Sequence, residues 1–187
     1  MLVIGFGHRA RQGKSLCAEA ICAHTTSKGF DARIYSFSDE VLWHCQERGL
    51  IPEATINWRS SIERKDLTPR QLEILGRVGF EERIHDPDFW IKRLFARIER
   101  DCYQVALIPN LRYRNEAERV TAAGGITVLI ERFNADGSHY IAPERNPNLR
   151  SETSLRGWPW DFRLAAISGQ TLWLERQARA LFDYLGG

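Results

Sequence analysis

The first fifteen residues constrain this chain more than any other stretch, because they combine a strand, a glycine-bearing loop and a helix start. The apolar run Leu2–Phe6 leads into a loop that ends in Gly13-Lys14-Ser15, and apolar residues at helical spacing follow. The pattern G-x-x-x-x-G-K-[ST] at such a junction is typical of a phosphate-binding loop, whose backbone N–H groups face anionic oxygens. There Lys14 would reach the β- and γ-phosphates, and the Ser15 hydroxyl would be a ligand of Mg²⁺. The sequence therefore predicts binding of ATP or another nucleoside triphosphate, with Mg²⁺.

The loop departs from the pattern at one position. The first glycine of the pattern falls on His8, and Gly7 stands one residue early. A chance Gly-Lys-Ser sequence at a helix start is the alternative interpretation. The strand before the loop and the helix after it favour a real phosphate-binding loop. Its candidate nucleotide-binding residues are Arg11, Gly13, Lys14, Ser15 and Leu16.

Composition predicts one soluble domain. The 187 residues are 43% hydrophobic and 27% charged, as is ordinary for a globular protein. Apolar runs are shorter than the roughly 18 residues of a membrane span, and the start lacks the regions of a signal peptide. The four cysteines show no metal-binding spacing, so we expect reduced thiols, no zinc site and a cytoplasmic location.

The net charge of +2 does not by itself indicate nucleic-acid binding, but the kind of positive charge is informative. Nearly all of it is arginine, whose planar donors suit phosphate and stack on bases. A GC-rich genome would also favour arginine codons. The two explanations remain open.

Strand and helix signals alternate along the chain, which predicts an α/β fold. We expect a three-layer sandwich with a central parallel sheet of about five strands, in a single domain over residues 1–187. Residues 49–86 would form an acceptor region, and residues 133–151, which lack periodicity, would form a lid. The predicted strands are Leu2–Phe6, Ala32–Phe37, Gln104–Pro109, Gly125–Arg132 and Phe162–Ile167. The predicted helices include Lys14–Ser27, Asp39–Arg48, one starting at Thr68-Pro69, Asp88–Arg100, Arg114–Ala123 and Thr171–Tyr184.

Several segments, in order, resemble the phage-type deoxynucleoside monophosphate kinases, a branch of the P-loop nucleotide kinases. Residues 10–15 (A-R-Q-G-K-S) are similar to that family's A-R-x-G-K-[DS] loop, and 37–39 (F-S-D) to its F-A-D segment. Residues 75–90 resemble its L-x-x-x-G-x-x-x-R and D-P-x-x-W stretch, and 112–118 (R-Y-R-N-E-A-E) its R-x-x-N-E-A-E motif. Ser151-Glu152-Thr153 is similar to the S-E-x that follows its lid.

This resemblance implies an ATP- and Mg²⁺-dependent kinase in the cytoplasm, a host's cytoplasm if phage-encoded. It also exposes a second departure: Asn110 stands where the family has an aspartate after the third strand. An amide can still accept from a metal-bound water, so Mg²⁺ would be held by Ser15 and the phosphates, with Asn110 acting through water. Another carboxylate could instead compensate.

The acceptor side of the predicted site rests on charged residues. Asp39 follows the second strand at the carboxyl end of the sheet, where open α/β sheets bind ligands. It is either a helix cap or a carboxylate that orients or deprotonates the acceptor. Arg112 is the predicted ligand of an acceptor phosphate, and Glu116 is a further candidate for substrate binding that would orient Arg112. Arg77 and Arg83 would hold acceptor phosphate or base, or form helix salt bridges.

Three arginines, Arg132, Arg145 and Arg150, bracket or lie within the predicted lid and could close over the triphosphate. Of these, Arg150 is the candidate nucleotide-binding residue. Solvation is the alternative for each.

Three functions remain open. The first is transfer of the γ-phosphoryl group of ATP to a deoxynucleoside monophosphate. The second is phosphorylation of the hydroxymethyl group of 5-hydroxymethyluracil within DNA, favoured by Asp39, Asn110 and the abundant arginine. The third is a catalytically silent nucleotide-binding protein. The sequence predicts no membrane partner and leaves the oligomeric state open, a homodimer included.

Overall fold

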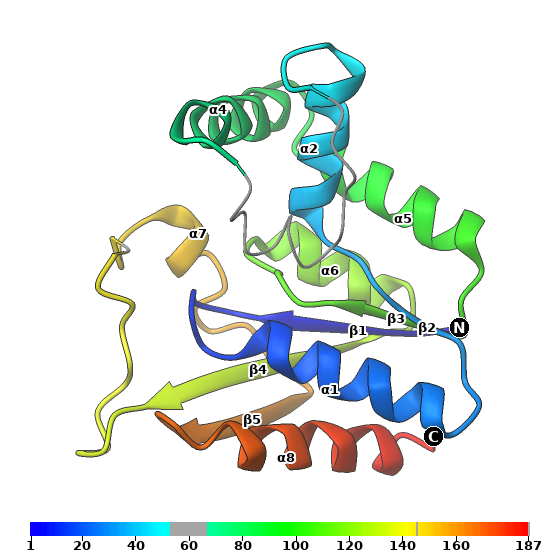
Figure 1. Ribbon diagram of the computed structural model, residues 1–187, viewed down its shortest axis with the longest axis vertical. Helices are drawn as coiled ribbons and strands as arrows, with labels where there is room; N and C mark the ends of the chain where they lie inside the picture. Colours follow the sequence, from blue (N-terminus) through cyan, green and yellow to red (C-terminus); the bar gives the residue numbers. More distant parts are fainter. Residues whose placement is uncertain (53–66, 145, 187) are drawn as a thin grey trace. The chain divides into compact units, whose positions relative to one another are not determined.

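The computed structural model of the chain describes residues 1–52, 67–144 and 146–186 (Figure 1). It contains two compact units. The first comprises Met1–Ile34 with Tyr103–Gly187, and the second comprises Tyr35–Cys102. Part of the predicted acceptor region (residues 53–66) and the predicted lid arginine Arg145 lie outside the described residues.

A five-stranded parallel sheet forms the centre of the first unit, in the order β2-β3-β1-β4-β5. The central strand β1 is buried along most of its length, and Ile4 pairs with Leu107 on one side and Ile126 on the other. The neighbouring strands β1 and β3 are continuous apolar runs, as is typical of strands covered on both faces. The predicted parallel sheet of five strands is confirmed. Its strands are β1 (Leu2–Gly7), β2 (Ala32–Ile34), β3 (Val105–Ile108), β4 (Ile126–Phe133) and β5 (Phe162–Ile167).

Helices cover both faces of this sheet, which gives the predicted three layers. Helices α1 (Lys14–Ser27) and α8 (Thr171–Tyr184) pack against each other on one face, and α6 (Arg114–Ala122) packs on the other, above the sheet in Figure 1. The short helix α7 (Arg150–Thr153) follows the segment after β4. None of the helices in the described ranges combines the length and apolarity needed to cross a membrane.

In the described part of the second unit three helices pack together, α2 (Phe37–Glu47), α4 (Pro69–His85) and α5 (Phe89–Asp101). The indole of Trp90 is buried between them, and its Nε1 donates to the Gly79 carbonyl at 3.0 Å. Thr68 caps α4 with Pro69 at the first helical position, as the sequence predicts.

The start of α2 differs from the prediction. The second strand ends at Ile34 rather than Phe37, because the Ser36 hydroxyl accepts from the Ser38 N–H at 3.2 Å and starts the helix earlier. Ser36, not Asp39, is therefore the cap of α2. Asp39 lies within the first turn and is only 2% exposed.

Close packing at the end of β1 leaves no room for a side chain at Gly7. An alanine Cβ there would overlap Cη2 of Trp160 and lie 2.9 Å from its Cζ3. We expect Gly7→Ala to lower the free energy of unfolding by about 1–3 kcal/mol, the usual cost of overpacking. Thermal and urea unfolding would measure this.

Gly76→Ala is the matched control. Gly76 lies within α4, and the described part of the chain places no atom within 4 Å of a Cβ there. We expect stability to stay the same or rise by about 0.5–1 kcal/mol through helix propensity. Equal stability of the two variants would contradict the packing at Gly7.

Candidate phosphate-binding site

The turn from β1 into α1 has the backbone geometry of an anion site. Gly13 precedes the helix with φ of 102°, a left-handed conformation that glycine adopts without strain. Among the described residues no side chain caps α1, and its first turn holds no acidic residue. In contrast, Ser36 and Thr68 cap α2 and α4. The first N–H groups of α1 and its positive dipole end are thus suited to a bound anion.

Lys14 and Ser15 occupy the first turn of α1. Lys14 is 6% exposed, and its ammonium group donates to the Arg9 carbonyl within the same loop. The half-buried Ser15 lies beside it. The predicted phosphate ligand Lys14 and the predicted Mg²⁺ ligand Ser15 are therefore adjacent, at the carboxyl end of the central strand, where parallel sheets bind ligands.

His8, which replaces the first glycine of the pattern, is a neutral residue of the loop. Burial, reinforced by the charges of Arg9, Lys14 and Arg112, lowers the pKa of the imidazole to about 4. Its Nδ1 is buried and makes no hydrogen bond to the described residues. The His8 carbonyl accepts from Nη1 of Arg112 at 2.7 Å.

The turn after β3 brings the predicted acceptor ligand to the loop. Oε2 of Glu116, which is 1% exposed, accepts from the backbone N–H groups of Arg112 at 2.7 Å and Tyr113 at 3.1 Å. Glu116 thus fixes the backbone that carries Arg112. Its predicted contact with substrate remains a prediction. Asn110 is half-buried two residues before Arg112, at the same edge of the sheet.

Two buried residues in this region were not predicted as part of the site. Glu152, in α7, is 4% exposed and accepts from the Ala10 N–H at 2.8 Å and from Arg112 Nη1 at 3.1 Å. Gln12 is 5% exposed and donates to the Tyr140 carbonyl at 3.1 Å, while its Oε1 accepts from the Arg132 N–H at 2.7 Å. The sequence pattern Ser-Glu-Thr gave no sign that Glu152 would be buried against the loop.

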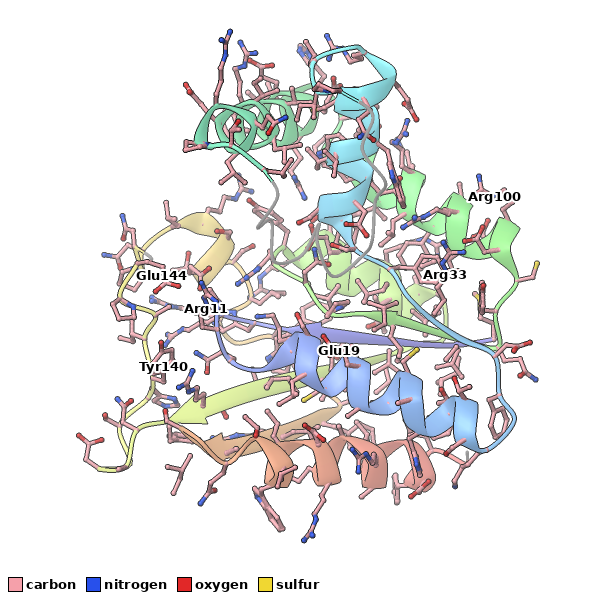
Figure 2. All side chains as sticks on the ribbon, in the orientation of Figure 1. Arg11, Glu19, Arg33, Arg100, Tyr140 and Glu144 are labelled. Atoms are coloured by element: carbon pink, nitrogen blue, oxygen red, sulfur yellow. The ribbon has the colours of Figure 1, made fainter. Side chains whose placement is uncertain are left out.

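The segment after β4 lies along the exposed side of the loop. Nε of Arg11 pairs with Glu144 at 2.7 Å, and both are labelled in Figure 2 near Tyr140. The Arg132 guanidinium stacks over the Tyr140 ring at 4.0 Å. Arg150, the predicted lid ligand, is exposed at the first position of α7.

The remaining predicted residues belong to the second unit. Asp39 is buried in α2, Arg77 is exposed on α4, and Arg83 donates from Nη1 to the Gly79 carbonyl at 2.9 Å. Their roles toward an acceptor remain predictions.

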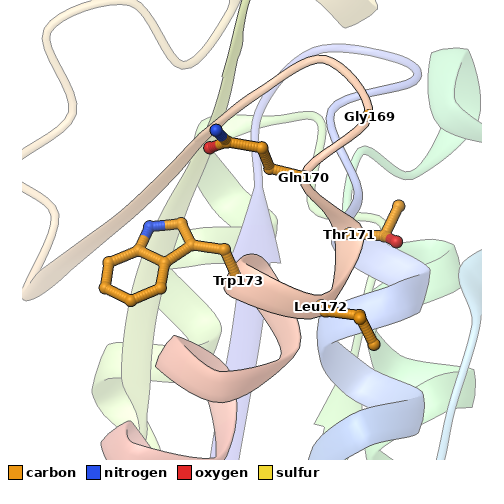
Figure 3. A pocket seen from close by; sticks show the side chains of 5 residues that line it. All are labelled: Gly169, Gln170, Thr171, Leu172 and Trp173. Carbon is orange, nitrogen blue, oxygen red and sulfur yellow. The ribbon is translucent and has the colours of Figure 1, made fainter.

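A groove of about 540 Å³ lies where β5 turns into α8. It is lined by residues 169–173, and Trp173 is 54% exposed. Figure 3 shows Gln170 and Trp173 extending to one side of this turn, with Thr171 and Leu172 to the other. The first turn of α8 also reaches the loop, because a Cβ at Gly13 would lie 2.6 Å from Cδ2 of Leu174.

No family model matches the chain, and no curated protein matches it. Among solved structures it is similar to the APS kinase CysC of Mycobacterium tuberculosis. A cysteine-to-alanine mutant of that enzyme is 16% identical, with a TM-score of 0.48, and its complex with AMPPNP and APS is 15% identical, with a TM-score of 0.47. Each alignment covers 100% of this chain and 98% of the other. At such values nothing about the chemistry of this chain follows from the likeness.

Proposed function

We propose that this chain is a phosphotransferase, a P-loop kinase that uses ATP and Mg²⁺ to phosphorylate a deoxynucleotide-type acceptor. The observation that carries this proposal is the N-terminus of α1. It begins at Gly13-Lys14-Ser15 without a side-chain cap among the described residues, at the end of the central strand of a parallel sheet. Such an end binds phosphate through backbone N–H groups and the helix dipole.

The residues of the loop fit a triphosphate and its metal. The N–H groups of residues 11–16 would bind phosphate oxygens, and Lys14 would leave the Arg9 carbonyl to contact the transferring group. The Ser15 hydroxyl would hold Mg²⁺, and Asn110 would contact a metal-bound water. When bound, Mg²⁺ supplies charge neutralisation on the phosphates. Phosphoryl transfer needs little more than such positioned charge.

The groove at residues 169–173 offers a place for the donor's base. It lies at the same sheet edge as the loop, two strands away, and the first turn of α8 contacts Gly13. The partly exposed indole of Trp173 offers an aromatic face, and the Gln170 amide offers hydrogen bonds to base edges. We propose that the adenine lies here.

A deoxynucleoside monophosphate is the acceptor that we favour. Arg112 lies beside the loop, with Nη1 on the His8 carbonyl, so a phosphate bound by its guanidinium would be close to the transferring group. An ionised phosphate acceptor needs no base. The four free thiols of the described residues agree with the proposed cytoplasmic location.

One observation favours the second acceptor. Asp39 is buried but does not cap α2, because Ser36 does. A buried carboxylate without the capping role is a candidate base, and only an alcohol acceptor requires one. The hydroxymethyl group of 5-hydroxymethyluracil within DNA is such an alcohol.

The test is transfer of labelled γ-phosphate from ATP, in parallel, to deoxynucleoside monophosphates and to DNA containing 5-hydroxymethyluracil. We expect label on the monophosphates and none without Mg²⁺. Label on the DNA alone would show that the acceptor is 5-hydroxymethyluracil within DNA and not a deoxynucleoside monophosphate. Label on neither acceptor would favour the silent nucleotide-binding protein.

Asp39→Asn separates the two acceptors further. On a monophosphate we expect a change of less than about threefold in kcat, because no proton must be removed. On an alcohol acceptor, loss of a general base costs about 10²–10⁴-fold. Glu118→Gln, on the exposed face of α6, is the matched control. A large loss on monophosphates would contradict the ionised acceptor.

A further inference from the structure

The carboxylate of Glu152 joins the loop to the acceptor arginine. Its Oε2 accepts from the Ala10 N–H at 2.8 Å, and its Oε1 accepts from Arg112 Nη1 at 3.1 Å. The side chain of Glu152 is 5% exposed and that of Arg112 is 22% exposed. Building on the proposed function, we infer that Glu152 is a positioning residue that sets the orientation of Arg112 toward the acceptor and anchors the first half of the loop.

Hydrogen bonds connect Arg112 to the loop both directly, through His8, and indirectly, through Glu152 and Ala10. Nη1 carries two N–H donors, and it contacts both the His8 carbonyl and Glu152. Glu152 in turn holds Ala10, two residues after His8 in the same loop. Because a guanidinium is planar, two contacts at one nitrogen fix the plane of the whole group relative to the loop.

The carboxylate lies where it does not compete with the nucleotide. The amides assigned to phosphate are those of residues 11–16, whereas Glu152 accepts from the Ala10 amide that precedes them. An anion at this point satisfies a buried loop donor and offsets the charge of Arg112 without occupying the α1 N-terminus. Glu152 therefore holds Ala10 and Arg112 without contacting the amides that would bind the nucleotide.

Glu152 also connects the site to the predicted lid. It belongs to α7, which directly follows residues 134–149. The same segment contacts the loop a second time, where Gln12 binds the Tyr140 carbonyl. Glu152 therefore contacts both Arg112 and the loop from the helix that follows this segment.

The experiment measures Glu152→Gln, with Glu118→Gln as the control for the same chemical change at an exposed site. The glutamine amide can still accept from Ala10 but removes the ion pair with Arg112. We expect the KM for the monophosphate acceptor to rise about tenfold or more, with ATP affinity changed less than about threefold. In an Arg112→Ala background the same substitution should change that KM less than about threefold, because coupled residues are not additive.

Two kinetic outcomes would overturn the inference: a Glu152→Gln variant that behaves like Glu118→Gln, or an effect that persists undiminished without Arg112. If Glu152→Gln does not fold, Glu152→Asp, which keeps the charge but shortens the reach, is measured by the same readouts. Its acceptor KM should rise several-fold, and a KM equal to that of the wild type would overturn the inference.

A second readout is independent of turnover. Amide hydrogen exchange of a peptide covering residues 8–12, in nucleotide-free protein, should be faster in Glu152→Ala than in the wild type, because Ala10 loses its acceptor. Unchanged exchange would refute the anchoring. A wild-type protein that phosphorylates neither acceptor would overturn the proposed function instead, and exchange would then decide on Glu152 alone.

Discussion

Replacing Lys14 with alanine is expected to reduce phosphoryl transfer by about 10²–10³-fold in kcat, the usual cost of removing one preorganised donor from developing charge. Lys14 is buried at the start of α1, and its ammonium group would exchange the Arg9 carbonyl for a phosphate oxygen. Steady-state transfer of labelled γ-phosphate would measure the loss.

Lys92→Ala is the matched control. Lys92 lies on α5 and pairs with Asp86 at the surface, so its removal should leave kcat within about twofold, because exposed ion pairs contribute little. Circular dichroism should show that both variants fold. Full activity in Lys14→Ala would refute the assignment of the loop and revive the silent nucleotide-binding protein.

The sequence predicts most of the fold because its strands are strongly apolar and its turns carry clear signals. The helices Lys14–Ser27 and Thr171–Tyr184 and the strand Phe162–Ile167 begin and end where predicted. The second strand is shorter than predicted, since a capping serine overrides the β-propensity of Tyr35 and Phe37.

The sequence predicts only part of the site, because local patterns do not reveal contacts between residues far apart in the chain. The motif around Gly13-Lys14-Ser15 predicts the geometry of the phosphate-binding loop, since its strand, turn and helix are contiguous in sequence. Glu152 contacts Ala10 across 142 residues of chain, and Gln12 contacts Tyr140 across 128. Such pairs depend on how β4 and the segment after it return to the loop.

His8 shows how the loop tolerates a departure from its pattern. The neutral imidazole adds no charge to a region that already carries the positive charges of Arg9, Lys14 and Arg112. Its carbonyl, which any residue would supply, is the group that contacts Arg112. Replacing glycine by histidine thus retains the backbone contact and keeps the electrostatics of the loop cationic.

Arg112→Ala is the second large effect that we expect, a loss of about 10²–10³-fold in kcat/KM for a deoxynucleoside monophosphate. A charge-assisted contact between arginine and phosphate is strong, and alanine removes it entirely. It also leaves Glu152 buried without its ion-pair partner, so stability should fall by about 1–3 kcal/mol. Kinetics and thermal unfolding, measured together, would separate these two effects.

Arg114→Ala controls for charge on the same turn, because Arg114 is exposed and donates to the Arg156 carbonyl. We expect its kcat/KM to stay within about threefold of the wild type. The size of the Arg112 loss also depends on the acceptor. A hydroxymethyl group carries no phosphate at its accepting oxygen, so on modified DNA Arg112→Ala should cost much less. An equal loss on both acceptors would mean that Arg112 contacts the transferring phosphoryl group rather than the acceptor, and would move it to the donor side of the site.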